Sequence, residues 1–152
     1  TDISYIPTKQ GTLYLSVICD LFDLSIVAYK TSTRQSIKLV LDTVRLAMEK
    51  EKVTAELQLH SDQGFQYASQ SYFTLTTQYG ITPSMSRRAN PYDNAMAENF
   101  FSILKSECIR LYKPETIHDA QTLIDEYIAF YNHDRIQLNS KLSPIEKRRL
   151  FA

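Results

Sequence analysis

The stretch TLYLSVIC, residues 12–19, alternates between two sets of side chains. One set is Leu13, Leu15, Val17 and Cys19, and the other is Thr12, Tyr14, Ser16 and Ile18. A period of two predicts a β-strand whose two faces meet different surroundings. DISYIP (2–7) and LSIVAYK (24–30) are also short and rich in β-branched and aromatic residues, and turn-like TKQG and DLFD separate them from this strand. We therefore predict a three-stranded antiparallel meander.

Helices and strands are then expected to alternate. The expected elements are a helix capped by Thr33 and ending near Lys52, a strand over 55–59 leading into HSDQG, a helix over 69–79 closed by Gly80, and an edge strand over 81–85. A strand, a crossover helix and a second strand favour parallel neighbours. The sequence thus predicts an α/β fold with a mixed five-stranded sheet, three antiparallel strands followed by parallel ones, flanked by helices.

The stretch PYDNAMAENFFSILKSE, residues 91–107, predicts a helix over about 95–111, capped by Asp93 or Asn94. Its expected buried stripe is Ala97, Phe101, Leu104, Cys108 and Leu111. Glu98, Ser102 and Lys105 form a polar stripe beside it, because they follow at i, i+4 and i+7. On helix patterning alone, such a stripe is most simply a solvated face.

Two further helices are expected in a C-terminal helical extension over about 114–152. Thr116 with Asp119 resembles a cap for a helix whose core-facing residues are Ile117, Ala120, Ile124, Tyr127 and Tyr131. Ser143, Pro144 and Glu146 match an N-cap, an N1 proline and an N3 glutamate.

Composition narrows the class of protein. The chain has 152 residues, 43% hydrophobic residues and a formal net charge of zero, which fits one globular domain and argues against a strong general polyanion binder. It has no tract long and apolar enough to span a membrane, and its two cysteines are expected to be reduced core thiols of a cytoplasmic protein. Because it starts at Thr1 without an initiator Met, we expect an excised domain of a longer protein.

If the first and fourth strands lie side by side, Asp2 and Asp62 become neighbours, and Glu98 on the later helix closes the group. With the strings TDISYI, HSDQG and NPYDNAMAENFF, this constellation resembles the catalytic core of DDE transposases and retroviral integrases, which has an RNase H-like fold. More closely, it is similar to the second-frame (OrfB) transposase of the bacterial insertion-sequence-three family, whose terminal YN, R and SP pattern matches YIAFYNHDRIQLNSKLSPIE. That family usually has Gly where this chain has Ala89.

The resemblance implies that Asp2, Asp62 and Glu98 are catalytic and hold two Mg²⁺ or Mn²⁺ ions, about 3.5 to 4 Å apart in the active complex. It implies 3′-end cleavage and strand transfer on DNA, with DNA and other copies of the chain as partners. Lys105 matches the family's helix lysine or arginine, which is thought to contact DNA near the reacting end. Arg87, Arg88, His60 and Asn94 are further DNA-contact candidates.

Simpler readings stay open for these residues. Asp2 could be a solvated aspartate, Asp62 a turn residue and Glu98 a surface glutamate. His60 could orient Asp62, contact a phosphate or make only a local hydrogen bond, and Arg87 and Arg88 could simply be solvated. The alternatives for the whole chain are an RNase H-like nuclease or resolvase that only hydrolyses, and a catalytically silent DNA-binding module.

Overall fold

Three antiparallel strands run through the middle of the molecule. The structure, a computed structural model, describes residues 1–88 and 94–151. The strands are β1 (Asp2–Thr8), β2 (Gly11–Cys19) and β3 (Ile26–Ser32), and β2 lies between the other two. Asp2 lies opposite Val17 in the register of β1 and β2. The predicted meander is confirmed.

A second sheet pairs β4 (Leu57–Ser61) with β5 (Ile81–Met85) in parallel. The five expected strands are therefore all present, but their ladders form one sheet of three strands and one of two, rather than a continuous sheet of five. The two sheets meet at the start of β1, where the Thr1 nitrogen donates a hydrogen bond to the His60 carbonyl oxygen at 2.7 Å. Because β4 ends two residues later than its predicted range, Asp62 directly follows the strand.

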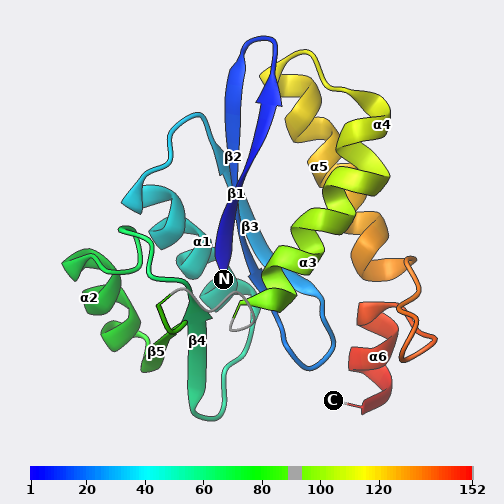
Figure 1. Cartoon of the computed structure of the whole chain (residues 1–152). Coiled ribbons are helices and arrows are strands. Elements are labelled where there is room, and N and C mark those ends of the chain that lie inside the picture. Colours follow the sequence, from blue (N-terminus) through cyan, green and yellow to red (C-terminus); the bar gives the residue numbers. More distant parts are fainter. Residues whose placement is uncertain (89–93, 152) are drawn as a thin grey trace.

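Helices cover the strands on two sides (Figure 1). They are α1 (Ile37–Lys50) and α2 (Gln70–Gln78) on one side, and α3 (Ala95–Leu104), the π-helical turn η1 (Lys105–Ile109), α4 (Arg110–Tyr112) and α5 (Ile117–His133) on the other, with α6 (Pro144–Phe151) below α5 in the view of Figure 1. The cap of α1 is Ser36 rather than Thr33, because the Ser36 hydroxyl accepts the Leu39 N–H at 3.3 Å. Gly80 closes α2 with φ of +68°, as predicted.

The central sheet has a hydrophobic core on each side. Leu13, Leu15 and Val17 pack with α3 and α5, while Ile18 packs with α1, α2 and β4. In the second half of β2, both alternating sets of side chains are therefore buried. The sequence pattern had predicted different surroundings for the two sets. A sheet covered on both sides places its edges and strand ends, rather than its faces, at the surface.

The predicted helix over 95–111 is present but changes its winding at η1. A π-helical turn holds one more residue than an α-helical turn, so positions beyond it are rotated by about 100° from the α-helical expectation. Ala97, Phe101, Leu104 and Cys108 are buried as predicted, but Leu111 is 69% exposed. The prediction for Leu111 was wrong because the residue pattern alone carried no sign of this turn.

The two C-terminal helices begin where their caps predict. The Thr116 hydroxyl accepts the Asp119 N–H at 3.0 Å, and α5 contributes Ile124 and Tyr131 to the core. At α6 the Ser143 N–H donates to the Glu146 carboxylate at 2.8 Å. Helix α5 is thus packed against the strands rather than attached beside them.

Candidate active site

Asp2 begins β1 and is half-buried. Its Oδ1 accepts the Ile3 N–H at 2.9 Å. Burial is the main cause that raises the pKa of Asp2 to about 6; the Ile3 N–H opposes the rise, and the negative charges of Asp62 and Glu98 add to it. Both of the other predicted carboxylates therefore act electrostatically on Asp2.

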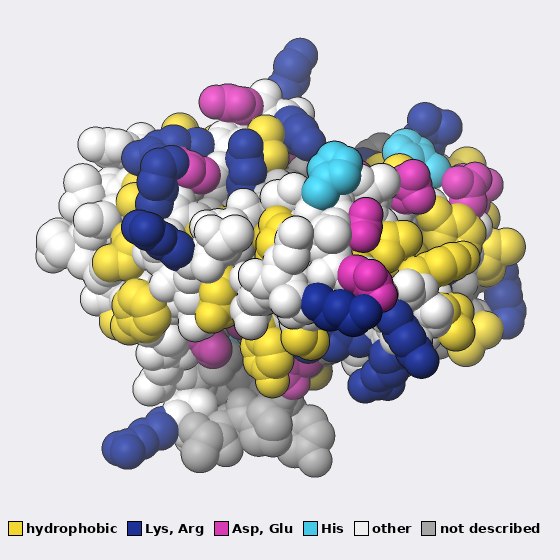
Figure 2. Space-filling view, turned by 90° about the horizontal axis from the view of Figure 1, so that it is seen from above, with side chains coloured by type: hydrophobic (Ala, Val, Ile, Leu, Met, Phe, Trp, Pro, Cys, Tyr) yellow, Lys and Arg dark blue, Asp and Glu magenta, His cyan; other side chains and the backbone are white. Residues whose placement is uncertain are grey.

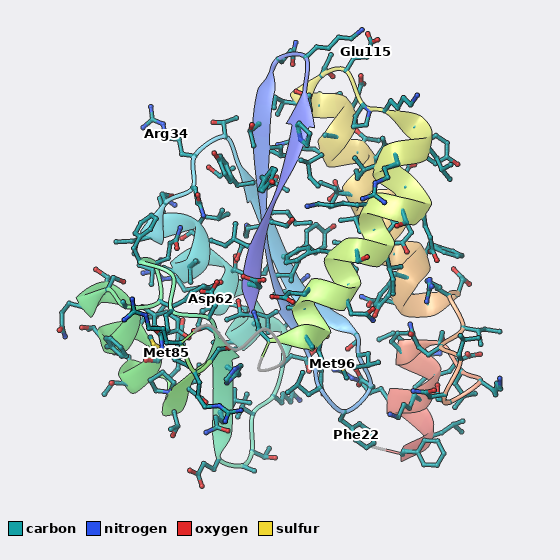
Figure 3. All side chains as sticks on the ribbon, viewed as in Figure 1. Phe22, Arg34, Asp62, Met85, Met96 and Glu115 are labelled. Carbon is teal, nitrogen blue, oxygen red and sulfur yellow. The ribbon has the colours of Figure 1, made fainter. Side chains whose placement is uncertain are left out.

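Asp62 reaches the same region from the end of β4. The hydrogen bond from Thr1 to His60 fixes the two chain segments side by side, one residue before Asp2 and two residues before Asp62. Figure 3 labels Asp62 and shows it close to the start of β1 in this view. Strand ends are common positions for functional side chains in α/β folds.

Gly64 leaves room for the Asp62 carboxylate. Asp62 Oδ1 accepts the Gly64 N–H at 2.7 Å, and a Cβ on Gly64 would lie 2.9 Å from the same oxygen. Gly64 does not need a positive φ for its turn, so the close approach is the reason that glycine suits this position. The string HSDQG therefore combines the carboxylate with the glycine that admits it.

Glu98 lies in the first turn of α3 and is exposed. Asn94 occupies the N-cap position, but its side chain makes no capping hydrogen bond within the described residues, and Asp93, the other predicted cap, lies outside them. The side chain of Met96, near Glu98 on α3, is labelled in Figure 3 on the other side of the start of β1 from Asp62. The three carboxylates thus come from three different elements.

These carboxylates are near one another without forming a closed metal site. In the part of the chain that the structure describes, no group of three His, Cys, Asp or Glu side chains is arranged to hold a metal ion. The donor chemistry nevertheless fits Mg²⁺ or Mn²⁺, because all three side chains offer hard carboxylate oxygens. Like charges at about 4 Å repel by roughly 4 kcal/mol at an effective dielectric of 20, which opposes closure without a cation.

Lys105 stands at the start of η1, seven residues beyond Glu98. Its ammonium lies 4.9 Å from the centre of the Tyr5 ring on β1. Burial lowers the pKa of Lys105, and the positive charge of Arg110 lowers it further. Sequence reasoning singled out Lys105 but missed Tyr5, because the contact between them joins a strand and a helix that lie far apart in the sequence.

His60 and Ser86 hold β4 and β5 together beside Asp62. His60 Nδ1 lies 3.0 Å from the Ser84 hydroxyl, and its Nε2 lies 2.9 Å from the Ser86 hydroxyl. Both ring nitrogens are therefore engaged, as the local hydrogen-bond reading expected, and a phosphate contact by His60 stays a prediction. Arg87 and Arg88 follow Ser86 directly and are exposed, which places two cations near this end of β4.

Basic side chains do not form one continuous patch on the face seen in Figure 2. Lys and Arg lie in separate groups there, with acidic and apolar side chains between them. This distribution agrees with the formal net charge of zero. A DNA contact on this chain would thus depend on a few placed cations rather than on a broad positive field.

Residues 1–91 match the family described as "Integrase core domain", and residues 98–149 match a second family with the same description. The chain belongs to the integrase core domain family. This match covers more than half of the chain and includes both aspartates. The resemblance inferred from the sequence is therefore confirmed.

Insertion-sequence transposases are among the relatives of this integrase core. The chain is 46% identical over 136 residues to the transposase for insertion sequence element IS904 of Lactococcus lactis, covering 89% of this chain and 54% of that protein. It is 39% identical over 149 residues to the putative transposase InsK for insertion sequence element IS150 of Escherichia coli, covering 97% and 53%. The chain spans about half the length of these two relatives.

Retroviral integrases share the fold. The HTLV-2 integrase catalytic core domain in complex with magnesium superposes with a TM-score of 0.74 at 16% identity, covering 95% of this chain and 90% of that one. A chain of the simian T-cell lymphotropic virus intasome gives a TM-score of 0.82 at 18% identity, covering 95% and 51%. These likenesses confirm the RNase H-like fold class. The structure also contains no described helix that is long and apolar enough to cross a membrane.

Proposed function

We propose that this integrase core is the catalytic domain of an insertion-sequence transposase that cleaves DNA at 3′ ends and transfers the new ends to target DNA. The observation that carries the proposal is the hydrogen bond from Thr1 to His60, which brings the start of β1, where Asp2 lies, against the end of β4, which Asp62 follows. Carboxylates from a strand start, a strand end and a helix are unfavourable neighbours unless a cation offsets them. Membership of the integrase core family supports the same reading.

Asp2, Asp62 and Glu98 would hold the divalent cations. When bound, the ions would supply activation of the attacking oxygen and stabilisation of the leaving 3′ oxygen. The chain itself prepares the aspartates: the Ile3 N–H orients Asp2, and the Gly64 N–H orients Asp62. Glu98 has no such bond among the described residues, so it is the carboxylate that we expect to move most when ions bind.

DNA would approach over Lys105, Arg87 and Arg88. Because the formal net charge is zero, we expect weak binding that depends steeply on salt and little on sequence. A longer protein that carries this chain would add recognition of the element's ends, and assembly of several copies on DNA belongs to the same proposal. A cytoplasmic location stays a prediction.

A strand-transfer assay tests this function. The chain, and any longer protein that carries it, is incubated with Mg²⁺ and a duplex with a pre-cleaved 3′-hydroxyl end. We expect joined products from the unaltered chain, a loss of at least about a hundredfold in D62N, and no change in D134N, which alters an exposed aspartate at the end of α5.

The same assay separates the alternatives. Hydrolysis without joining would favour an RNase H-like nuclease or resolvase. Equal Mg²⁺-dependent activity in the unaltered chain and D62N would contradict a catalytic role for Asp62. DNA binding without any metal-dependent chemistry would favour a silent binding module.

A further inference from the structure

Tyr5 and Lys105 form a contact across the open edge of β1. Neighbouring residues of a strand point to opposite faces, so Tyr5 points away from the core face on which Ile6 packs with α3. Lys105 comes from the helix on that core face and reaches the Tyr5 ring around the strand edge. In the described residues, β1 is paired with β2 alone along this stretch, so no strand covers the edge.

The two side chains differ in how freely they can move. Tyr5 is 62% exposed, yet its backbone is fixed in the β1–β2 ladder opposite Tyr14. Lys105 has a long flexible side chain that would otherwise sample many rotamers, and holding an ammonium over a tyrosine face reduces that freedom. The contact therefore places a partly exposed cation at a defined position.

The backbone turn that carries Lys105 is fixed as well. Two residues further along η1, Glu107 accepts hydrogen bonds from Arg135 Nη2 at 2.7 Å and from the Tyr127 hydroxyl at 2.6 Å. Both partners belong to α5 or follow it directly, and α5 is part of the core. The turn that carries Lys105 is thus attached to the rigid part of the molecule, independently of Tyr5.

The distance from the carboxylates can be obtained along two separate elements. Tyr5 follows Asp2 by three strand residues, a rise of about 10 Å. Lys105 follows Glu98 by seven helical residues, also about 10 Å. The contact therefore lies about 10 Å along each element from the carboxylate that the element carries.

We propose that Tyr5 is a positioning residue that holds Lys105 against one DNA phosphate close to the carboxylates. This inference rests on the proposed function and adds to it the residue that sets the lysine and the phosphate that it meets. Tyr5 acts through Lys105 rather than on DNA directly. An aromatic ring is required for this role, and the tyrosine hydroxyl is not.

The contact can be tested without DNA. In NMR spectra the Lys105 Hε protons are expected to show an upfield ring-current shift in the unaltered chain and in Y5F, and to lose it in Y5L. Unchanged Hε shifts in Y5L would overturn the contact. Circular dichroism and thermal unfolding of Y5L are compared with those of Y14L, its cross-strand neighbour, so that a general loss of fold is recognised.

DNA affinity then tests the role. We expect Y5L to weaken binding about two- to fivefold and Y5F to leave it unchanged. K105M should weaken binding more and reduce the salt slope by about one. In the K105M background, Y5L should have no further effect; an equal loss in both backgrounds would mean that Tyr5 contacts DNA itself and would overturn the proposal.

Replacing single phosphates by neutral methylphosphonates locates the contact. One position close to the reacting phosphate should lose affinity in the unaltered chain and in Y5F, and lose much less in Y5L and K105M. A uniform response along the strand, or sensitivity at a position that does not depend on Lys105, would overturn the assignment. A chain that binds DNA in this pattern but joins no ends would contradict the proposed function alone.

Discussion

The Thr1 nitrogen donates a hydrogen bond to the His60 carbonyl oxygen, and this 2.7 Å contact connects the three-stranded sheet to the two-stranded one. It fixes the start of β1 against the end of β4, and so places Asp2 in the electrostatic range of Asp62. Every property of the candidate site that depends on two aspartates follows from this junction.

We expect D2N to stabilise the metal-free chain at pH 7. The pKa of Asp2 is raised in the folded state to about 6 from 3.8, so folding loses stability as pH rises from about 4 to about 6, and the loss persists above that range. Asn keeps an oxygen for the Ile3 N–H and removes the charge. Urea unfolding in EDTA should show a gain of about 1 to 2 kcal/mol at pH 7, allowing for partial exposure, and no gain below pH 4.

The control for D2N is E56Q, which removes an exposed carboxylate and should change little at either pH. Equal stability of D2N and the unaltered chain at pH 7 would show that burial of Asp2 carries no cost.

We expect Mg²⁺ to make the unaltered chain more stable than D2N. Ions that bind the folded carboxylates and not the unfolded chain stabilise it by mass action, so we expect the unfolding temperature to rise by roughly 5 °C at an ion concentration about a hundredfold above the dissociation constant. D2N and D62N should show little of this rise in a thermal melt with and without Mg²⁺. A rise of the same size in D62N would place the ion elsewhere on the chain.

Much of the fold was predictable because its signals are local. The strand alternation of 12–19, the glycine cap of α2 and the capping residues Thr116 and Ser143 each act within a few residues. The division of the sheet was not predictable, because it depends on whether β1 and β4 form a ladder beyond the single hydrogen bond between Thr1 and His60. The position of Leu111 was not predictable either, since no local pattern marks the π-helical turn, and the partners of its Glu107 lie far along the chain, on and after α5.

The site was predicted in part for the same reason. Asp2, Asp62 and Glu98 stand in recognisable strings, and two of these three lie at strand ends. Tyr5 and Arg135 act through contacts with Lys105 and Glu107, which lie far away in the sequence, so no local spacing encodes them. Lys147, Arg148 and Arg149 appear in the sequence as one basic cluster, yet Arg148 turns inward to three carboxylates.

We expect G64A to reduce activity with little loss of stability. The added Cβ would lie 2.9 Å from Asp62 Oδ1 and would displace the carboxylate, which is the end of a side chain and can move. A displacement of about 1 Å at a reacting group can cost about a hundredfold in rate. The strand-transfer rate should fall at least tenfold while urea unfolding changes by less than about 1 kcal/mol.

G80A is the matched control for G64A, because it should change stability rather than activity. Nothing lies within 4 Å of a Cβ there, but φ of +68° strains any residue other than glycine by about 1 to 2 kcal/mol. G80A should therefore lower stability and leave the rate of the folded chain unchanged. If G64A lowers stability and keeps full activity, the proposed role of the Asp62 position is wrong.

Substitution of Arg148 should lower the stability of the fold more than substitution of most other partly exposed residues. Arg148 donates to Asp23 at 2.6 Å, and the Asp23 side chain is only 1% exposed. R148M leaves that carboxylate buried without its cation, which we expect to cost about 3 to 5 kcal/mol in urea unfolding. The double variant R148M/D23N should recover part of the loss, and a double variant as unstable as R148M would mean that packing of α6, rather than charge, is responsible.

The pairing of Glu107 with Arg135 should appear as stability that depends on pH. Arg135 is the main cause that lowers the pKa of Glu107, and Tyr127 adds to it. This contribution is complete above the unfolded value near 4.5 and is lost as pH falls through the lowered folded value. E107Q should lose about 1 kcal/mol at pH 7 and less at pH 3, as measured by urea unfolding.

E115Q provides the comparison for E107Q, because the Lys9 pair of Glu115 is highly exposed and should contribute under about 0.5 kcal/mol. If E107Q and E115Q change the free energy of unfolding equally, the idea that Glu107 anchors η1 to α5 is wrong.

The anchored π-helical turn also limits how the length of this segment can vary. Glu107 is attached to α5, and Glu98 lies nine residues earlier on the same continuous helix. Inserting or deleting one residue between them would turn the Glu98 carboxylate by about 100° around the helix axis, away from Asp2. Substitutions in this interval change one side chain at a time, whereas a change in its length would remove the third carboxylate from the site in a single step.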